Sequence, residues 1–223
     1  MNKLLILLSL ALVAGCKSYV PLNQSFLKSE SEVGLIVITR PMESTARLSG
    51  YKSALIYAAA SPWKKYEPAF KVIDPQINPT EKIKKAYQDA LEGKGKKVVV
   101  ISDEDLKKIK VESSSGKHYK TDLSFFKKKY QIEELLIVDV RYGLHSRYFY
   151  GGELNRSGKT FLYPTLVNLK DNSILYRQEI CPVVPLQGDW NTPPNYDNMK
   201  KAINASIDVA VHSAPSCLFI PKK

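Results

Sequence analysis

The stretch that most constrains the fold lies between residues 134 and 150. It begins with an unbroken apolar run at 135–138 and continues with apolar side chains at alternate positions, among them Tyr142 and Leu144. An unbroken run is typical of a strand covered on both faces, whereas alternation is typical of a strand with one face in solvent. We therefore expect one long central strand that leaves a covered part of a sheet for a half-exposed part.

Shorter strands are expected before and after this strand. Residues 34–39 and 98–101 are β-branched runs, which predict buried strands. Residues 160–169 and 173–180 flank a Lys-Asp-Asn turn, which predicts a late hairpin. Two loops are expected around this hairpin, one from its glycines and one from its prolines: 151–158 and 182–195.

Four segments carry the signals of helices. The clearest follows Asn78, which can cap a helix, and Pro79, which is tolerated in a first turn. Gly93 or Gly95 would end this helix, and Pro215 would end the last one. The predicted helices cover residues 79–92, 102–109, 122–130 and 199–214.

Residues 41–76 admit two interpretations. The apolar spacing from Tyr51 to Ala58 favours a helix packed on the sheet. Trp63 and Tyr66 lie among lysines, however, which is typical of a loop that faces a membrane or a partner. We therefore take Trp63 and Tyr66 as candidates for an interaction surface.

The order of these elements predicts the fold class. Helix-bearing connections between the early strands favour parallel pairing, and the late hairpins favour antiparallel pairing. The chain is therefore expected to form a single α/β domain over residues 34–223, a mixed-sheet sandwich with helices packed on the sheet.

The first sixteen residues indicate where the protein works. Lys3 precedes an apolar run of about ten residues, which suits a signal peptide and is too short for a transmembrane helix of roughly 20 residues. The following residues, Val13-Ala14-Gly15-Cys16, resemble the lipobox of bacterial lipoproteins. The resemblance implies that residues 1–15 are removed and that Cys16 is acylated, palmitate being a typical chain. An ordinary secretory signal with Cys16 as a plain thiol is the alternative.

The lipobox resemblance also implies a location and a tether. Lys17 stands where lipoproteins retained in the inner membrane usually carry Asp, so the resemblance implies the outer membrane, on its periplasmic side. The polar composition of residues 16–33 predicts a lipidated N-terminus and a flexible tether that lifts the domain off the membrane.

The charge of the chain indicates its partners. The formal net charge is +11, and a basic surface attracts polyanions. For an exported protein we expect anionic lipid head groups or other envelope proteins as partners, in addition to membrane lipid held through Cys16, and no nucleic acid. A lysine-rich soluble surface without a partner is the alternative.

Two cysteines remain after Cys16. In an oxidising periplasm Cys181 and Cys217 are expected to form a disulfide, and two buried free thiols are the alternative. No His or Cys lies at ligand spacing from either one, so we expect no metal. The sequence contains no phosphate-binding loop or nucleophile elbow, and no cofactor is expected.

Two stretches resemble an uncharacterised family of bacterial outer-membrane lipoproteins. They are residues 125–140, in which a helix leads into a buried strand, and residues 188–194 (GDWNTPP) before the last helix. The similarity extends over residues 78–212. The fold of that family resembles the α/β domain shared by the curli-secretion lipoprotein and the amino-terminal domain of the Tol translocation protein. The resemblance implies a periplasmic interaction domain and not an enzyme. This chain lacks an evident pair of long membrane-crossing strands, so we expect no secretion pore.

One polar group and one loop are the remaining candidates for a site. Asp139, Arg141, His145 and Arg147 share a face of the central strand. Asp139 and His145 would suit acid–base chemistry, but six residues of strand span about 20 Å. We therefore favour a solvated face with cross-strand ion pairs. Trp190 lies in a proline-rich loop, where it is either an interaction residue or a plug that seals the sheet.

The sequence thus predicts a lipid-anchored interaction or envelope-assembly protein without enzymatic activity. A structural subunit of an oligomeric envelope complex is the first alternative. An envelope hydrolase that uses Asp139 and His145 is the second.

Overall fold

A hairpin of two long strands forms the centre of the sheet. The computed structural model describes residues 19–29, 31–49, 62–107, 116–149 and 152–219. Strands β4 (Glu134–Phe149) and β5 (Gly152–Asn168) pair antiparallel, from Glu134 opposite Asn168 to Phe149 opposite Gly152. The predicted central strand is therefore confirmed. The loop predicted over 151–158 is wrong, because β4 supplies backbone partners to β5 from residue 152 onward.

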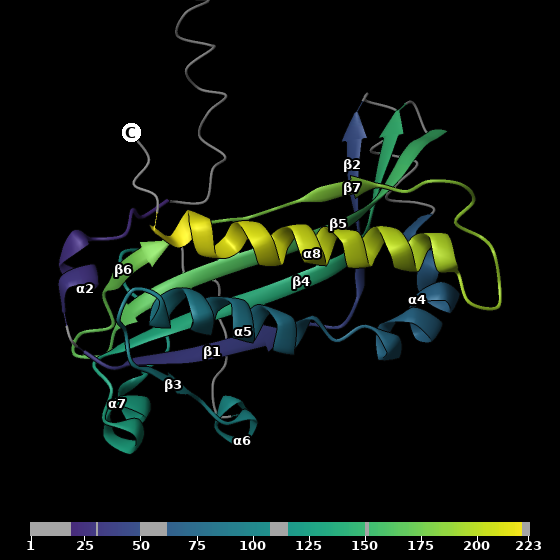
Figure 1. Ribbon diagram of the computed structural model, residues 1–223. Coiled ribbons are helices and arrows are strands. Elements are labelled where there is room, and N and C mark those ends of the chain that lie inside the picture. The colour runs from purple at the N-terminus through teal and green to yellow at the C-terminus, as the bar shows by residue number, and fades with distance from the viewer. Residues whose placement is uncertain (1–18, 30, 50–61, 108–115, 150–151, 220–223) are drawn as a thin grey trace, which may run out of the picture.

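The other described strands complete a mixed sheet, seven-stranded over the described residues, which confirms the predicted fold class (Figure 1). Strand β1 lies between β3 and β4 and runs parallel to both, and β6 pairs antiparallel with β5. Strand β2 pairs with β4 beyond β1, and β7 pairs with β5. Their bounds are β1 (Val33–Thr39), β2 (Glu43–Ser49), β3 (Val98–Val100), β6 (Ile174–Arg177) and β7 (Val183–Pro185).

Strands β1 and β2 follow the same edge of β4 with a break between them. Thr39 lies opposite Val140, and Glu43 lies opposite Gly143, so the β1–β2 side has one extra residue at the break. Gly143 has φ +149°, and a Cβ there would lie 1.9 Å from the carbonyl oxygen of Glu43. This close approach explains why β4 carries glycine at the break.

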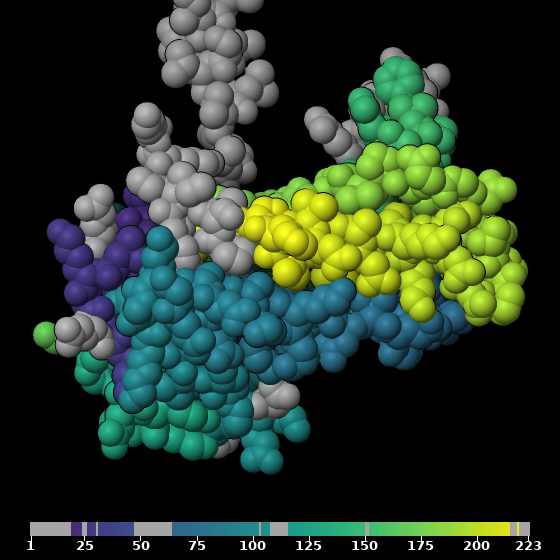
Figure 2. All heavy atoms as spheres, in the orientation of Figure 1, coloured from purple at the N-terminus to yellow at the C-terminus, as the bar shows by residue number. Residues whose placement is uncertain are grey.

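Two helices cover one face of the sheet. Helix α5 (Pro79–Glu92) and helix α8 (Asp197–Phe219) lie along one another over it, and the end of the β4–β5 hairpin projects beyond them (Figures 1 and 2). Asn78 caps α5 as predicted, because its side chain accepts a hydrogen bond from the Thr80 amide at 3.1 Å. The expectation that Pro215 ends the last helix is wrong. Ala214 and Leu218 are both buried, and their packing holds the turn that contains the proline.

The opposite face is covered over the first part of β4. Helix α6 (Asp103–Leu106) and helix α7 (Ser124–Tyr130) lie where short helices were predicted. Phe126 of α7 packs in a core with Leu135 and Ile137, which point to this face of β4. These helices occupy only the part of the face near the start of the strand.

Among the described residues of the segment 41–76, the structure contains a strand that neither interpretation predicted. The segment begins with β2 and, after residues 50–61, continues as η2 (Pro62–Tyr66), α4 (Glu67–Ile73) and η3 (Asp74–Gln76). The helix predicted from Tyr51 to Ala58 lies outside the described residues. The strand was missed because Glu43–Ser49 is polar, and pairing with β4 decides its conformation.

The expected tether is partly folded onto the domain. Residues 24–28 form helix α2 (Gln24–Lys28), and the ring of Phe26 is 2% exposed in the core beneath α5. The sequence pattern missed this segment because one buried aromatic residue and a few backbone hydrogen bonds hold it, against an otherwise polar composition. No described helix is long and apolar enough to cross a membrane.

Candidate interaction face on the long hairpin

Beyond α7, one face of the β4–β5 hairpin carries polar and aromatic side chains. Because alternate residues of a strand share a face, Arg141 and His145 of β4 lie on the same side as Lys159, Phe161 and Tyr163 of β5. All five side chains are half-buried. We call these five residues and Asp139 the hairpin face. Helices α5 and α8 pack on the opposite side of the sheet.

Asp139 organises the start of the hairpin face. The Arg40 guanidinium donates two hydrogen bonds to its carboxylate, from Nε at 2.9 Å and from Nη2 at 3.1 Å, and Arg141 Nη2 lies 3.4 Å away. The hydrogen bond from Arg40 to Asp139 raises the pKa of Arg40. Two guanidinium groups therefore hold the Asp139 side chain in place.

Aromatic and cationic side chains continue the hairpin face along β5. The rings of Phe161 and Tyr163 stack with centroids 5.9 Å apart and an interplanar angle of 8°. Arg141 lies 5.5 Å from the Tyr163 ring centroid, and Lys159 Nζ lies 4.2 Å from that of Phe161. Burial, together with the charge of Glu179, raises the pKa of Tyr163 to about 12, so its hydroxyl stays protonated. Stacking holds these side chains in place before any partner arrives.

The structure keeps Asp139 and His145 apart. His145 Nδ1 lies 3.0 Å from Thr45 Oγ1 on β2, whereas the described partners of Asp139 are Arg40 and Arg141. Six residues of strand between them correspond to about 20 Å. The pair therefore does not form one compact acid–base site. Arg147, the fourth member of the predicted group, is exposed farther along β4.

Tyr66 and Trp190, two predicted interaction residues, meet on the other side of the sheet. Their ring centroids are 4.9 Å apart in an edge-to-face arrangement, and Arg156 of β5 lies 5.7 Å from the Trp190 ring. Tyr66 is only 1% exposed, and Trp190 is half-buried. In this position the pair seals the end of the sheet and offers little area to a partner. Trp63 lies in η2, and its side chain is outside the described residues.

A buried carboxylate lies beneath Tyr66. Glu153 of β5 accepts hydrogen bonds from the Tyr66 hydroxyl, from Lys65 Nζ at 2.6 Å and from the Tyr148 hydroxyl at 3.2 Å, and it is paired with Arg156. Burial alone would raise the pKa of Glu153, but hydrogen bonds from Lys65, Tyr66 and Ser146 and the charge of Arg156 lower it to about 2. A carboxylate held ionised by so many donors is a structural anchor and a poor general base.

The cysteines do not form the predicted bridge in this structure. Cys181 is a half-buried free thiol whose pKa is raised by burial, and the side chain of Cys217 lies outside the described residues. Within the described part of the chain, no three His, Cys, Asp or Glu side chains are grouped so as to hold a metal ion.

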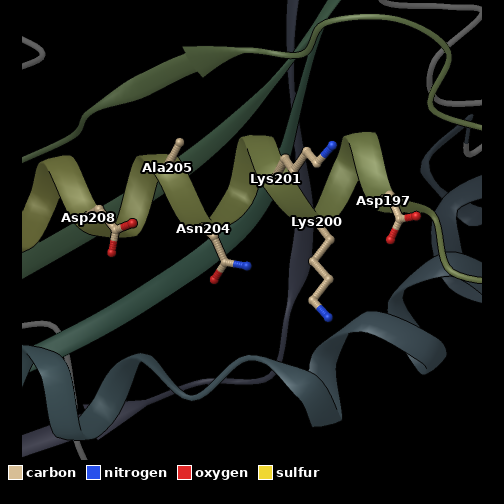
Figure 3. A pocket seen from close by; sticks show the side chains of 6 residues that line it. All are labelled: Asp197, Lys200, Lys201, Asn204, Ala205 and Asp208. Atoms are coloured by element: carbon tan, nitrogen blue, oxygen red, sulfur yellow. The ribbon is translucent and has the colours of Figure 1, made fainter.

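The solvent side of α8 carries a shallow hollow of about 380 Å³. Figure 3 shows the residues that line it along the helix. Lys200 donates to Gln76 of η3, and Asp208 pairs with Lys82 of α5 at 2.9 Å. These charges join α8 to its neighbours, so the hollow does not compete with the hairpin face as a site. It is lined by Asp197, Lys200, Lys201, Asn204, Ala205 and Asp208.

Sequence reasoning found only half of the hairpin face. The central-strand residues were identified, but Lys159, Phe161 and Tyr163 of β5 were not, and neither was Arg40, which holds Asp139. Phe161, Tyr163 and Thr165 alternate within the predicted hairpin strand, and this alternation could have placed them beside Asp139 and Arg141. Arg40 carries no such signal, because its position depends on the break between β1 and β2.

The fold and the hairpin face together define the class of this protein. It is a mixed α/β domain with a pre-arranged surface of aromatic and cationic side chains. No protein-family model matches the sequence, and no curated protein matches it either. The expected similarity to the curli-secretion lipoprotein and the Tol domain stays a prediction.

Several solved structures are similar to this chain at low identity. The hypothetical protein CT253 from Chlamydia trachomatis is 11% identical over 86% of this chain and 99% of that chain, with a TM-score of 0.40. Protein XCC0632 from Xanthomonas campestris is 10% identical over 89% and 90% of the two chains, with a TM-score of 0.38. Lipoprotein GNA1162 from Neisseria meningitidis is 10% identical over 82% and 99%, with a TM-score of 0.34. At these identities and TM-scores, the structural similarities do not indicate a function.

Proposed function

We propose that the protein is a lipid-anchored, non-enzymatic interaction protein on the periplasmic side of the bacterial outer membrane. The motif Val13-Ala14-Gly15-Cys16 supports the anchor, and Lys17 supports the outer membrane. The buried carboxylates of Asp105, Asp139 and Glu153 are each held by cationic partners, which supports binding over acid–base catalysis.

The hairpin face is the proposed docking site for a partner protein of the envelope. The observation that carries this proposal is the half-exposed row in which Arg141 stacks on Tyr163, and Lys159 on Phe161. Tyrosine and arginine are enriched among the residues that dominate interface energies. Because neighbouring rings and charges already hold these side chains, they lose little freedom when a partner binds.

Site-specific crosslinking in intact cell envelopes tests the docking site. A photo-crosslinking residue replaces Asn155, which is exposed on β5 beside the hairpin face, and captured proteins are identified by mass spectrometry. We expect a discrete adduct that Tyr163→Ala and Arg141→Ala each weaken by about tenfold, since a hot-spot side chain contributes roughly 1–2 kcal/mol or more. Lys201→Ala on the solvent side of α8 is the matched control and should leave the adduct unchanged. An adduct insensitive to both face variants would overturn the docking site.

Self-assembly into an envelope complex is the second candidate. Strand β2 pairs with β4 along one of its edges, and Phe149 and Leu154 at the end of the hairpin are 49% and 58% exposed. Within the described residues β2 has no second strand partner, and such an edge strand with exposed apolar side chains nearby favours pairing between copies. Sedimentation of the purified protein discriminates the two candidates. Self-assembly predicts that the wild-type protein is an oligomer and that the double variant Phe149→Ser, Leu154→Ser dissociates. Self-assembly is excluded if both the wild-type protein and the double variant are monomers.

A further inference from the structure

The segment that follows the acylation motif is fixed to the domain. We call residues 19–29 the N-terminal strap. Val20 exchanges two backbone hydrogen bonds with Arg177, at 3.0 and 2.9 Å, on the outer edge of β6. Farther along the strap, Phe26 is buried in the core, and Lys96 Nζ donates to Ser29 Oγ at 2.7 Å. The strap is therefore part of the folded body, which shortens the free chain between the lipid and the domain.

The length of that free chain limits the height of the domain above the membrane. Four residue steps separate Cys16 from Val20, and an extended chain spans at most about 3.5 Å per step, or roughly 14 Å in all. An acylated Cys16 lies at the head groups. The outer edge of β6 is then held within about 14 Å of the head groups. This distance is comparable to the Debye length of roughly 8 Å plus the reach of a lysine side chain, so lysines on this edge can be attracted to charged head groups.

The same edge of β6 carries exposed lysines. The segment after residue 116 also follows this edge, since Lys117 O accepts from the Ile174 amide at 2.9 Å and Asn172 O accepts from the Tyr119 amide at 2.8 Å. Lys117 and Lys120 of this segment and Lys170 of the adjoining turn are exposed. We call these three residues the lysine edge.

The surroundings of the lysine edge also suit a membrane surface. Tyr19, next to the anchoring residue Val20, is 40% exposed, and tyrosine is enriched where protein meets lipid head groups. The nearby carboxylates of Asp122 and Asp171 accept hydrogen bonds from the backbone amides of Ser124 and Ser173, both at 2.9 Å. These local bonds hold the two carboxylates in their own turns, while the three lysines are exposed.

We propose that the lysine edge lies against the anionic lipid head groups of the membrane, so that the domain is held flush and not lifted off. This inference rests on the proposed acylation of Cys16. Strand β3 forms the opposite edge of the sheet, four strand spacings from β6, or about 19 Å farther from the lipid. The membrane thereby sets which edge of the sheet faces the periplasmic space.

Depth-dependent quenching tests this orientation. The acylated protein, with Cys181 and Cys217 replaced by serine, is placed in vesicles of phosphatidylethanolamine and phosphatidylglycerol that contain a head-group spin label. A fluorophore on Lys117→Cys should be quenched at least threefold more than one on Glu104→Cys, which is exposed on α6 beside β3. Equal quenching of the two positions on vesicle-bound protein overturns the orientation. Protein that fails to bind vesicles overturns the proposed anchor instead.

A charge-reversal comparison tests the lysine edge without the lipid. The Cys16→Ala protein should bind phosphatidylglycerol vesicles weakly at low salt and phosphatidylcholine vesicles less. Replacing all three lysines of the edge by Glu should reduce binding about a hundredfold or more, because each lysine near an anionic surface contributes roughly fivefold. The matched control reverses Lys64, Lys85 and Lys201, which are exposed elsewhere. Equal losses in the two triple variants would contradict a specific edge.

Discussion

At the scale of single residues, buried carboxylates connect separate elements of this protein, and Glu153 and Asp139 are two of them. Glu153 joins three elements, because its partners lie on η2, β4 and β5, and its side chain is 9% exposed. Asp139 similarly joins the end of β1 to β4 and begins the hairpin face. Both residues therefore hold neighbouring elements in register.

Acid should weaken the fold through Glu153. The pKa of Glu153 is about 2, below the ordinary value of roughly 4.3. Its contribution to the free energy of unfolding is therefore complete above about pH 4.5 and is lost as the pH falls towards 2. Glu153→Gln should lower the free energy of unfolding at pH 7 by about 2 kcal/mol and flatten its decline between pH 4.5 and 2. Chemical denaturation at several pH values measures this effect.

The matched control for that prediction is Glu81→Gln. The Glu81 side chain is 68% exposed on α5, so its replacement should change stability by less than about 0.5 kcal/mol at every pH. If the free energy of unfolding declined with pH equally in the wild-type and Glu153→Gln proteins, the assigned role of Glu153 would be refuted.

At the scale of elements, close backbone contact joins the hairpin to α8. A Cβ on Gly158 would lie 2.0 Å from the carbonyl oxygen of Ala202. Thr160 and Ser206, one turn farther along, bridge the same interface with a buried hydrogen bond of 2.8 Å. The small residues let the helix lie directly on β5, and a larger side chain has no room there.

Gly158→Ala should therefore destabilise the protein by about 2–4 kcal/mol, because α8 must move away from the strand. Gly116→Ala is the control, since a Cβ at Gly116 meets no atom within 4 Å. Thermal unfolding followed by circular dichroism measures both variants. A Gly158→Ala protein as stable as Gly116→Ala would contradict the close packing.

Sequence patterns predicted the elements whose own residues decide their conformation. Helix α5 has a capping Asn78 and an apolar stripe, and β4 has its unbroken run, so both were found. Strand β2 and the first half of β5 are polar and owe their conformation to pairing with β4, so no local pattern indicated them. The contact of Arg40 with Asp139 was missed for the same reason, because it depends on pairing distant in the sequence.

At the scale of the whole molecule, the N-terminal strap connects the proposed anchor to the core. Phe26 of the strap is 2% exposed, and the Lys96 ammonium group lies 4.4 Å from its ring. Lys96 is 3% exposed, so its charge is withdrawn from solvent where it holds the strap, and this burial lowers its pKa. The strap therefore fixes the position of the sheet relative to the proposed anchor.

Phe26→Ala should release the strap, at a cost of about 3 kcal/mol for a buried aromatic side chain. Cleavage by trypsin after Lys28, which is exposed in α2, should then be at least tenfold faster than in the wild-type protein. Phe125→Ala, at a ring 40% exposed on α7, is the control and should leave that cleavage rate unchanged. Equal cleavage rates in all three proteins would show that the strap does not depend on Phe26.

The mass spectrum of the mature protein isolated from its own membrane tests the central claim most directly. Acylation of Cys16 predicts a chain without residues 1–15 whose N-terminal peptide carries the mass of fatty acyl chains. The Cys16→Ala variant should lack that mass and leave the membrane fraction. A protein that begins at Met1 and carries no lipid would contradict the anchor, the docking site in the envelope and the orientation of the lysine edge together.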